Sequence, residues 1–213
     1  MPRKKDLLTG YKLVFALIGF SAIVTEIATL IERGTFAPID FFSFFTVQTN
    51  ILVVIALILS ALAVAGDEHS HRDRLRAAAV VYILVVGLGF SVLLAGLEGV
   101  QFTAVWWDNM VLHYIMPAAM LADYVLDRPR QRLSFRLSLV WLLYPIAYFA
   151  YSLTRGALTG WYPYPFLDPG LRGYGAIFVT ALGLLGLSVV LIWVVTKLSG
   201  DVDRTQAKGL SAI

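Results

Sequence analysis

The chain has 213 residues, of which 59% are hydrophobic and 15% are charged, with a formal net charge of +3. Soluble domains carry nearer a quarter charged residues, so this composition excludes an ordinary soluble protein. The absence of cysteine excludes disulfides, thiolate metal sites and cysteine nucleophiles.

Six long apolar runs occupy most of the chain. A membrane-spanning helix needs roughly 20 mostly apolar residues. Runs of about that length lie at 11–31, 41–66, 77–98, 105–126, 136–155 and 174–198. They predict an all-α polytopic membrane protein, with a domain of six transmembrane helices over residues 1–198. The polar tail at 199–213 is predicted to be disordered and cytoplasmic.

The first run follows the basic segment MPRKK, a pattern that signal peptides share. The run continues past the length of a normal signal-peptide core, and no small-x-small cleavage site closes it. We therefore expect a retained first helix.

The distribution of basic residues predicts the topology. All but three of the 17 Lys and Arg residues lie near the termini or in the connections after the second and fourth runs. The exceptions are Arg33, Arg155 and Arg172. The positive-inside rule then places both termini in the cytoplasm of a multi-pass cell-membrane protein. The basic charge is thereby explained without a nucleic-acid partner, and membrane lipids are the expected partners. The sequence does not define an oligomeric state.

The second run opens with FFSFFTVQTN, residues 41–50, which carries more hydrogen-bonding groups than a lipid-facing helix needs. Ser43, Thr46 and Asn50 are spaced i, i+3 and i+7, which predicts one shared helical face. Gln48 adds a further polar group. With the topology above, this face lies near the outer boundary of the membrane.

Ionisable residues occur at a similar depth in two other runs. The fourth run opens with WWDNMVLHYIMP, which places Asp108 and Asn109 just inside the outer boundary and His113 about 10 Å deeper. Glu26 lies in the outer half of the first run. Such residues are costly in a membrane and indicate functional sites. We expect these groups to line an outward-opening pocket, although hydrogen bonding between neighbouring helices is an alternative use for them.

Thr46 and His113 together suggest nucleophilic catalysis. A threonine hydroxyl is a weak nucleophile, but an imidazole can take its proton and return it to a leaving alcohol. Asn109 is a candidate to orient the imidazole or donate to an oxyanion, and Asp108 is a second candidate to orient it. The sequence contains neither an H-E-x-x-H zinc motif nor a G-x-S-x-G elbow. We expect neither a metal nor a cofactor.

An aromatic segment, GWYPYPFLDP, lies between the last two runs and on the predicted outer side. Trp161, Tyr164, Pro165 and Phe166 belong to it. Such a segment is typical of an interfacial aromatic belt. It also lies over the predicted pocket, where it would cover a lipid-entry groove.

Three pieces of the sequence together resemble the androgen-induced-gene family of six-span membrane proteins. They are FFSFFTVQTN, then DNMVLHYIMP with Asn109, His113 and Pro117, and GWYPYPFLDP. The resemblance implies an intramembrane threonine hydrolase that cleaves esters of fatty acids with hydroxy fatty acids. His113 becomes the base and Thr46 the nucleophile. Ser43 is the alternative nucleophile, because the family's Phe-x-Thr-Phe pattern overlays either position.

Two other functions fit the same residues. A non-catalytic lipid-binding or transport protein would use Glu26, Asp108 and His113 as a proton-coupled relay. A purely structural membrane subunit would need these polar residues only for stability.

Overall fold

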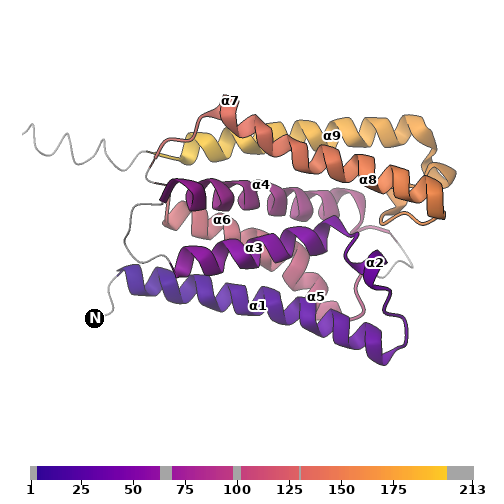
Figure 1. The fold of residues 1–213 in the computed structure, drawn as a ribbon, viewed down its shortest axis with the longest axis horizontal. Helices are drawn as coiled ribbons and strands as arrows, with labels where there is room; N and C mark the ends of the chain where they lie inside the picture. Colours follow the sequence, from indigo (N-terminus) through magenta and orange to yellow (C-terminus); the bar gives the residue numbers. More distant parts are fainter. Residues whose placement is uncertain (1–3, 63–68, 98–101, 130, 201–213) are drawn as a thin grey trace, which may run out of the picture.

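The computed structural model describes residues 4–62, 69–97, 102–129 and 131–200, and every element in these ranges is a helix (Figure 1). The longer helices run back and forth along one common direction. The elements are α1 (Lys4–Glu32), α2 (Pro38–Phe41), α3 (Phe45–Ala61), α4 (His69–Leu93), α5 (Trp106–Met110), η1 (Val111–Ile115), α6 (Met116–Leu126), α7 (Phe135–Ser138), η2 (Leu139–Leu142), α8 (Leu143–Thr159), η3 (Pro165–Leu167) and α9 (Pro169–Leu198).

Four helices in the described ranges are long and apolar enough to cross a membrane. They are α1, the His71–Leu93 part of α4, the combined helix Phe135–Thr159, and α9. The predicted second run instead gives α3, an apolar helix of 17 residues. The predicted fourth run is divided into α5, η1 and α6. The all-helical class is therefore confirmed for the described residues, and the four long apolar helices are consistent with a membrane protein, whereas six spans and cytoplasmic termini stay predictions.

The second helix begins later than the sequence predicted, and this corrects the placement of Ser43. Pro38 starts the short helix α2, which ends at Phe41. The backbone is then extended at Phe44, and α3 begins at Phe45. Ser43 therefore lies in the turn between two helices, so the predicted helical face shared by Ser43, Thr46 and Asn50 is wrong for Ser43.

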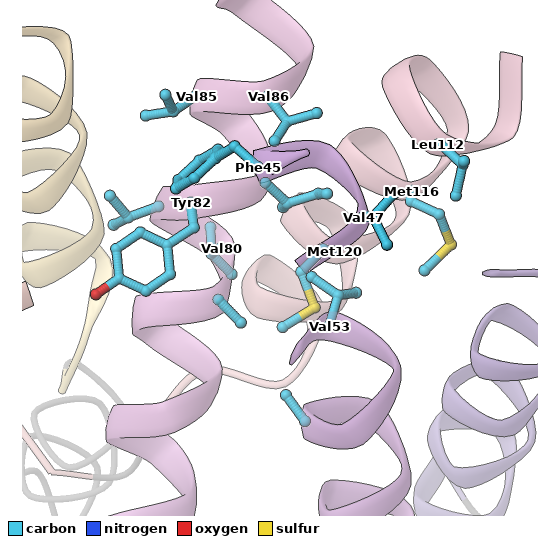
Figure 2. Close-up of a cluster of buried hydrophobic side chains, with 14 of the residues drawn as sticks. Phe45, Val47, Val53, Val80, Tyr82, Val85, Val86, Leu112, Met116 and Met120 are labelled. Atoms are coloured by element: carbon cyan, nitrogen blue, oxygen red, sulfur yellow. The ribbon is translucent and has the colours of Figure 1, made fainter. Parts of the chain in front are cut away.

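Helix α4 forms the centre of the bundle. It packs against α3 and α6 on one side and against α9 on another (Figure 1). Its residues 77–83 are all buried, and small and β-branched side chains dominate them. Figure 2 shows apolar side chains of α3, α4 and the η1–α6 helix gathered into one cluster. The labelled members are Phe45, Val47, Val53, Val80, Tyr82, Val85, Val86, Leu112, Met116 and Met120.

A glycine and a proline set the contact between α4 and the η1–α6 helix. Pro117 has no N–H to donate to the carbonyl of His113 four residues earlier, and a proline ring crowds that carbonyl in a regular helix. Residues Val111–Ile115 accordingly form a π-helix. A Cβ atom on Gly87 would lie 3.0 Å from Pro117 Cγ and 3.1 Å from His113 O. Glycine at position 87 therefore lets α4 approach the wide turn that carries His113.

The two ends of the bundle carry different polar clusters. At the end where α1 begins and α9 finishes, Lys12 pairs with Asp123 and lies 2.8 Å from Asp127. Arg76 pairs with Asp127 at 2.7 Å. We call Lys12, Arg76, Asp123 and Asp127 the Lys12 cluster. These charges connect α1, α4 and the end of α6.

The predicted tail at 199–213 lies outside the described residues except for Ser199 and Gly200. These two residues pack against the connection between α6 and α7. Leu133 N donates to Ser199 Oγ at 2.9 Å, and Gly200 N donates to Pro129 O at 3.1 Å.

Candidate active site

The structure brings Thr46 and His113 together at the end of the bundle opposite the Lys12 cluster. Thr46 lies in the first turn of α3, and its Oγ1 atom is 3.3 Å from His113 Nε2. Both side chains are buried, at 8% and 4% exposure. The distance suits a weak hydrogen bond, and catalytic hydrogen bonds are often long before substrate binds.

The surroundings of His113 fix the direction in which it can move a proton. Its Nδ1 atom lies 3.1 Å from the backbone carbonyl of Asn109, which can only accept a hydrogen bond. Nδ1 therefore carries the proton, and Nε2 is left to accept from Thr46. The imidazole stacks on the Phe90 ring, with 3.9 Å between centroids. The ring is thus held from its edge and from one face.

Tyr164 completes the polar group around Thr46. Its hydroxyl lies 3.2 Å from the Thr46 backbone N and 3.3 Å from Thr46 Oγ1. The first N–H groups of a helix have no partner within the helix, so the Tyr164 oxygen satisfies one of them. Burial raises the pKa of Tyr164, so its phenol stays protonated at neutral pH and can donate. We call Thr46, His113 and Tyr164 the Thr46 cluster.

The aromatic segment is fixed over this cluster by α8 and by the turn before α3. Arg155 pairs with Asp40 and lies over the Trp161 ring, 4.3 Å from its centroid. Tyr164 stacks on Phe166 with 5.1 Å between centroids. Pro165 begins η3, whose short turn follows Tyr164. The sequence placed this segment at the pocket mouth but did not reveal that Tyr164 reaches Thr46, because no local pattern encodes that contact.

Two spaces adjoin the Thr46 cluster. The wide cavity, of about 360 Å³, has polar and apolar walls, which include Glu26, Arg33, Asp40, Thr103, His113 and Trp161. The apolar pocket, of about 60 Å³, lies between α4, α8, η3 and α9. Its walls include Val86, Gly89, Phe149, Phe166, Leu184 and Leu185. Thr46 and Tyr164 line both spaces.

The remaining polar residues of the predicted second span serve other contacts. Ser43 Oγ donates to Ile39 O at 2.6 Å and lies 2.7 Å from the Tyr151 hydroxyl. Gln48 donates to Phe42 O and accepts from the Tyr144 hydroxyl. These bonds fix the turn before α3 and its packing on α8.

Asn50 lies directly beneath the Thr46 cluster. Its Nδ2 atom donates to Thr46 O at 2.9 Å and to Leu112 O at 3.2 Å. Asn50 therefore ties α3 to the π-helix that carries His113. Asn109 acts on His113 through its backbone carbonyl, and its side chain lines a separate space.

Asp108 contacts Glu26 rather than His113. Glu26, which lines the wide cavity, accepts from the Ala104 backbone N at 2.8 Å, and the Asp108 carboxyl adjoins it. Arg33 donates to Ala104 O at 3.0 Å. Neither oxygen of Asp108 has a hydrogen-bond donor among the described residues.

Within the described ranges, no three His, Asp or Glu side chains gather closely enough to hold a metal ion. No family model matches the sequence, and the comparisons with curated proteins and with solved structures found no match.

Proposed function

We propose that this protein is an intramembrane hydrolase of lipid esters, with Thr46 as the nucleophile and His113 as the base. The supporting observation is the approach of Thr46 Oγ1 to His113 Nε2 at the wall of a cavity. The proposal agrees with the family resemblance, which suggests esters of fatty acids with hydroxy fatty acids.

In the first step, Thr46 Oγ1 attacks the carbonyl carbon of the ester. Its proton passes to His113 Nε2, while the proton on Nδ1 stays there and is donated in a hydrogen bond to Asn109 O. The carbonyl oxygen becomes an oxyanion, which the Tyr164 hydroxyl can stabilise together with the positive N-terminal end of α3. The ester C–O bond then breaks, and the leaving alkoxide takes the proton from Nε2.

In the second step, water releases the fatty acid. His113 Nε2 takes a proton from the water, and the oxygen of that water bonds to the acyl carbon. The bond from that carbon to Thr46 Oγ1 breaks, and Oγ1 recovers the proton from Nε2. The cycle consumes one water and yields one alcohol and one acid.

The proposed arrangement in the membrane has six spans, cytoplasmic termini and the Thr46 cluster in the outer half of the bilayer. It rests on the charge distribution and on the position of the Thr46 cluster at the end opposite the Lys12 cluster. Ester lipids of the outer leaflet would then reach the wide cavity.

Fluorophosphonate labelling of the purified protein in detergent tests the catalytic assignment. We expect the wild type to be labelled and Thr46→Ala and His113→Ala to lose labelling while they remain folded. Ser43→Ala should keep it, because Ser43 bonds to Ile39 and Tyr151 rather than to His113. Loss of labelling in Ser43→Ala alone would identify Ser43 as the nucleophile. A folded wild type that is never labelled would refute the proposal that the protein is a hydrolase.

The Glu26–Asp108 carboxyl pair favours one second candidate, a proton-coupled lipid transporter. The pair borders the same cavity as His113. Both imidazole nitrogens, however, already face Asn109 O and Thr46 Oγ1. Transport predicts proton-linked lipid uptake into liposomes that Glu26→Gln abolishes and Thr46→Ala leaves intact. A hydrolase predicts instead that Thr46→Ala abolishes ester cleavage and that Glu26→Gln leaves it intact.

A further inference from the structure

The two spaces that meet at Thr46 differ in chemistry and in which catalytic group they reach. The walls of the apolar pocket are almost entirely aliphatic and aromatic, with Leu184 and Leu185 of α9 on one side. The wide cavity contains charged side chains, among them Arg33 and Asp40. His113 lines the wide cavity and not the apolar pocket.

This asymmetry orients an ester on Thr46. During acylation the leaving oxygen must receive the proton from His113 Nε2, so the alcohol half must lie on the side that His113 faces. That side is the wide cavity. The acyl half, on the opposite side of the carbonyl carbon, then faces the apolar pocket.

On the basis of the hydrolase proposed above, we propose that the apolar pocket is an acyl-chain site and the wide cavity an alcohol site. The substrate class is therefore an ester of an unbranched fatty acid with a bulky alcohol that carries polar groups. A linear chain suits the narrow pocket, because its walls are almost entirely apolar and leave little room for branches. The wide cavity has about six times the volume of the apolar pocket and offers charged partners.

Gly89 provides the means to test the acyl site. It lines the apolar pocket, and a Cβ atom there would lie 3.6 Å from Leu184 Cδ2, which is ordinary contact. Gly89→Ala is therefore tolerated, whereas Gly89→Leu fills the pocket. Gly183 on α9 is exposed, and a Cβ atom there would meet nothing within 4 Å. Gly183→Leu is the matched control.

The first experiment compares 4-methylumbelliferyl acetate with 4-methylumbelliferyl oleate, which share one alcohol half. We expect Gly89→Leu to lower kcat/KM for the oleate at least tenfold relative to the acetate. Gly89→Ala should shift the same ratio about twofold to threefold, and Gly183→Leu should leave it unchanged. Equal loss on both esters, or an unchanged ratio in both Gly89 variants, would overturn the acyl assignment.

The second experiment fixes the acyl half and changes the alcohol. Ala37 lines the wide cavity only, and it is exposed before α2. We expect Ala37→Trp to lower kcat/KM for 4-methylumbelliferyl octanoate at least fivefold relative to ethyl octanoate, and to leave the acetate-to-oleate ratio unchanged. The ester would lie in the reverse orientation if Ala37→Trp changed the acetate-to-oleate ratio and Gly89→Leu changed the ratio between 4-methylumbelliferyl octanoate and ethyl octanoate.

Failure of this inference can be distinguished from failure of the hydrolase itself. If the wild type cleaves esters and Thr46→Ala does not, the hydrolase stands and the two ratios decide the orientation. If wild type and Thr46→Ala are equally inactive on all four esters, both proposals fail together.

Discussion

The two buried polar clusters, at opposite ends of one helical bundle, make different use of their polar groups. In the Lys12 cluster, charges of opposite sign pair directly, and Lys12, Arg76 and Asp123 are at most 3% exposed. The Thr46 cluster is made of neutral groups at hydrogen-bond distances of 3.2–3.3 Å beside two spaces.

Under the proposed function, burial of polar groups serves stability at the Lys12 cluster and chemistry at the Thr46 cluster. A buried ion cluster must satisfy its charges internally, because an unpaired charge in a low-dielectric interior is very costly. A catalytic group instead needs a lone pair or proton free to act on substrate. Substitutions should therefore separate the two ends: changes in the Thr46 cluster should affect activity, and changes in the Lys12 cluster should affect the free energy of unfolding.

The largest expected effect is that of His113→Ala on ester hydrolysis. Removal of a positioned general base costs about 10²–10⁴-fold in rate. We expect a loss of that size in kcat for 4-methylumbelliferyl octanoate, with little change in the melting temperature in detergent. A melting temperature that fell as far as in the Lys12 variants below would assign His113 a structural role instead.

Lys12→Met should give the largest loss of stability. It leaves the buried Asp123 carboxylate without its nearest cation, and breaking a buried pair in this way costs about 3–5 kcal/mol. Thermal unfolding in detergent measures the loss, and Lys5→Met on the exposed first turn of α1 is the control. Fluorophosphonate labelling of the protein that stays folded should be unchanged. An unchanged melting temperature in Lys12→Met would show that the Lys12–Asp123 pair makes no net contribution to stability.

Tyr164→Phe should affect activity more weakly than His113→Ala. The substitution removes one hydroxyl donor next to Thr46 and keeps the ring that stacks on Phe166. Loss of one oxyanion donor costs about 10²–10³-fold in kcat. Tyr162→Phe, in the same segment, is the control. An effect on KM alone would place Tyr164 in substrate binding and not in stabilisation of the transition state.

Gly87→Ala should act at a distance by displacing the π-helix that holds His113. The added Cβ would lie 3.1 Å from His113 O, which is tighter than ordinary contact. We expect a fall of about tenfold or less in kcat, since small displacements of a catalytic group are costly. Gly183→Ala on α9 is the control, because a Cβ atom there would meet nothing within 4 Å. Equal acetate activity in the two variants would contradict this account.

The smallest expected effect is the acid sensitivity contributed by Asp127. Burial raises the pKa of this carboxyl, but the charges of Lys12 and Arg76 lower it by more than burial raises it. The pKa of Asp127 therefore lies below its ordinary value. A carboxyl with a lowered folded pKa stabilises the protein above its unfolded pKa of about 3.9 and loses that contribution as pH falls through the folded value. Melting temperatures from pH 6 to pH 3 should therefore decline less steeply in Asp127→Asn than in wild type. Glu32→Gln, on the exposed end of α1, should decline as wild type does.

The sequence predicted the helices better than the exact places where they begin and end. Long apolar runs report burial or lipid exposure directly, so all six predicted runs overlap helices. Local backbone chemistry was harder to predict. Pro38 and the extended Phe44 separate Ser43 from α3, and Pro117 turns part of a regular helix into a π-helix.

The sequence by itself determined the helical class, the presence of helices long and apolar enough to span a membrane, and the choice of Thr46 and His113 as candidates. Those features depend on composition and on spacing along one helix, which are local properties. Only the tertiary structure decided that Tyr164 reaches Thr46, that Asp108 adjoins Glu26, and that Lys12 pairs with Asp123. Each of these contacts joins residues more than 80 positions apart in the chain. Helix packing alone brings such residues together, and no periodicity within one segment carries that information.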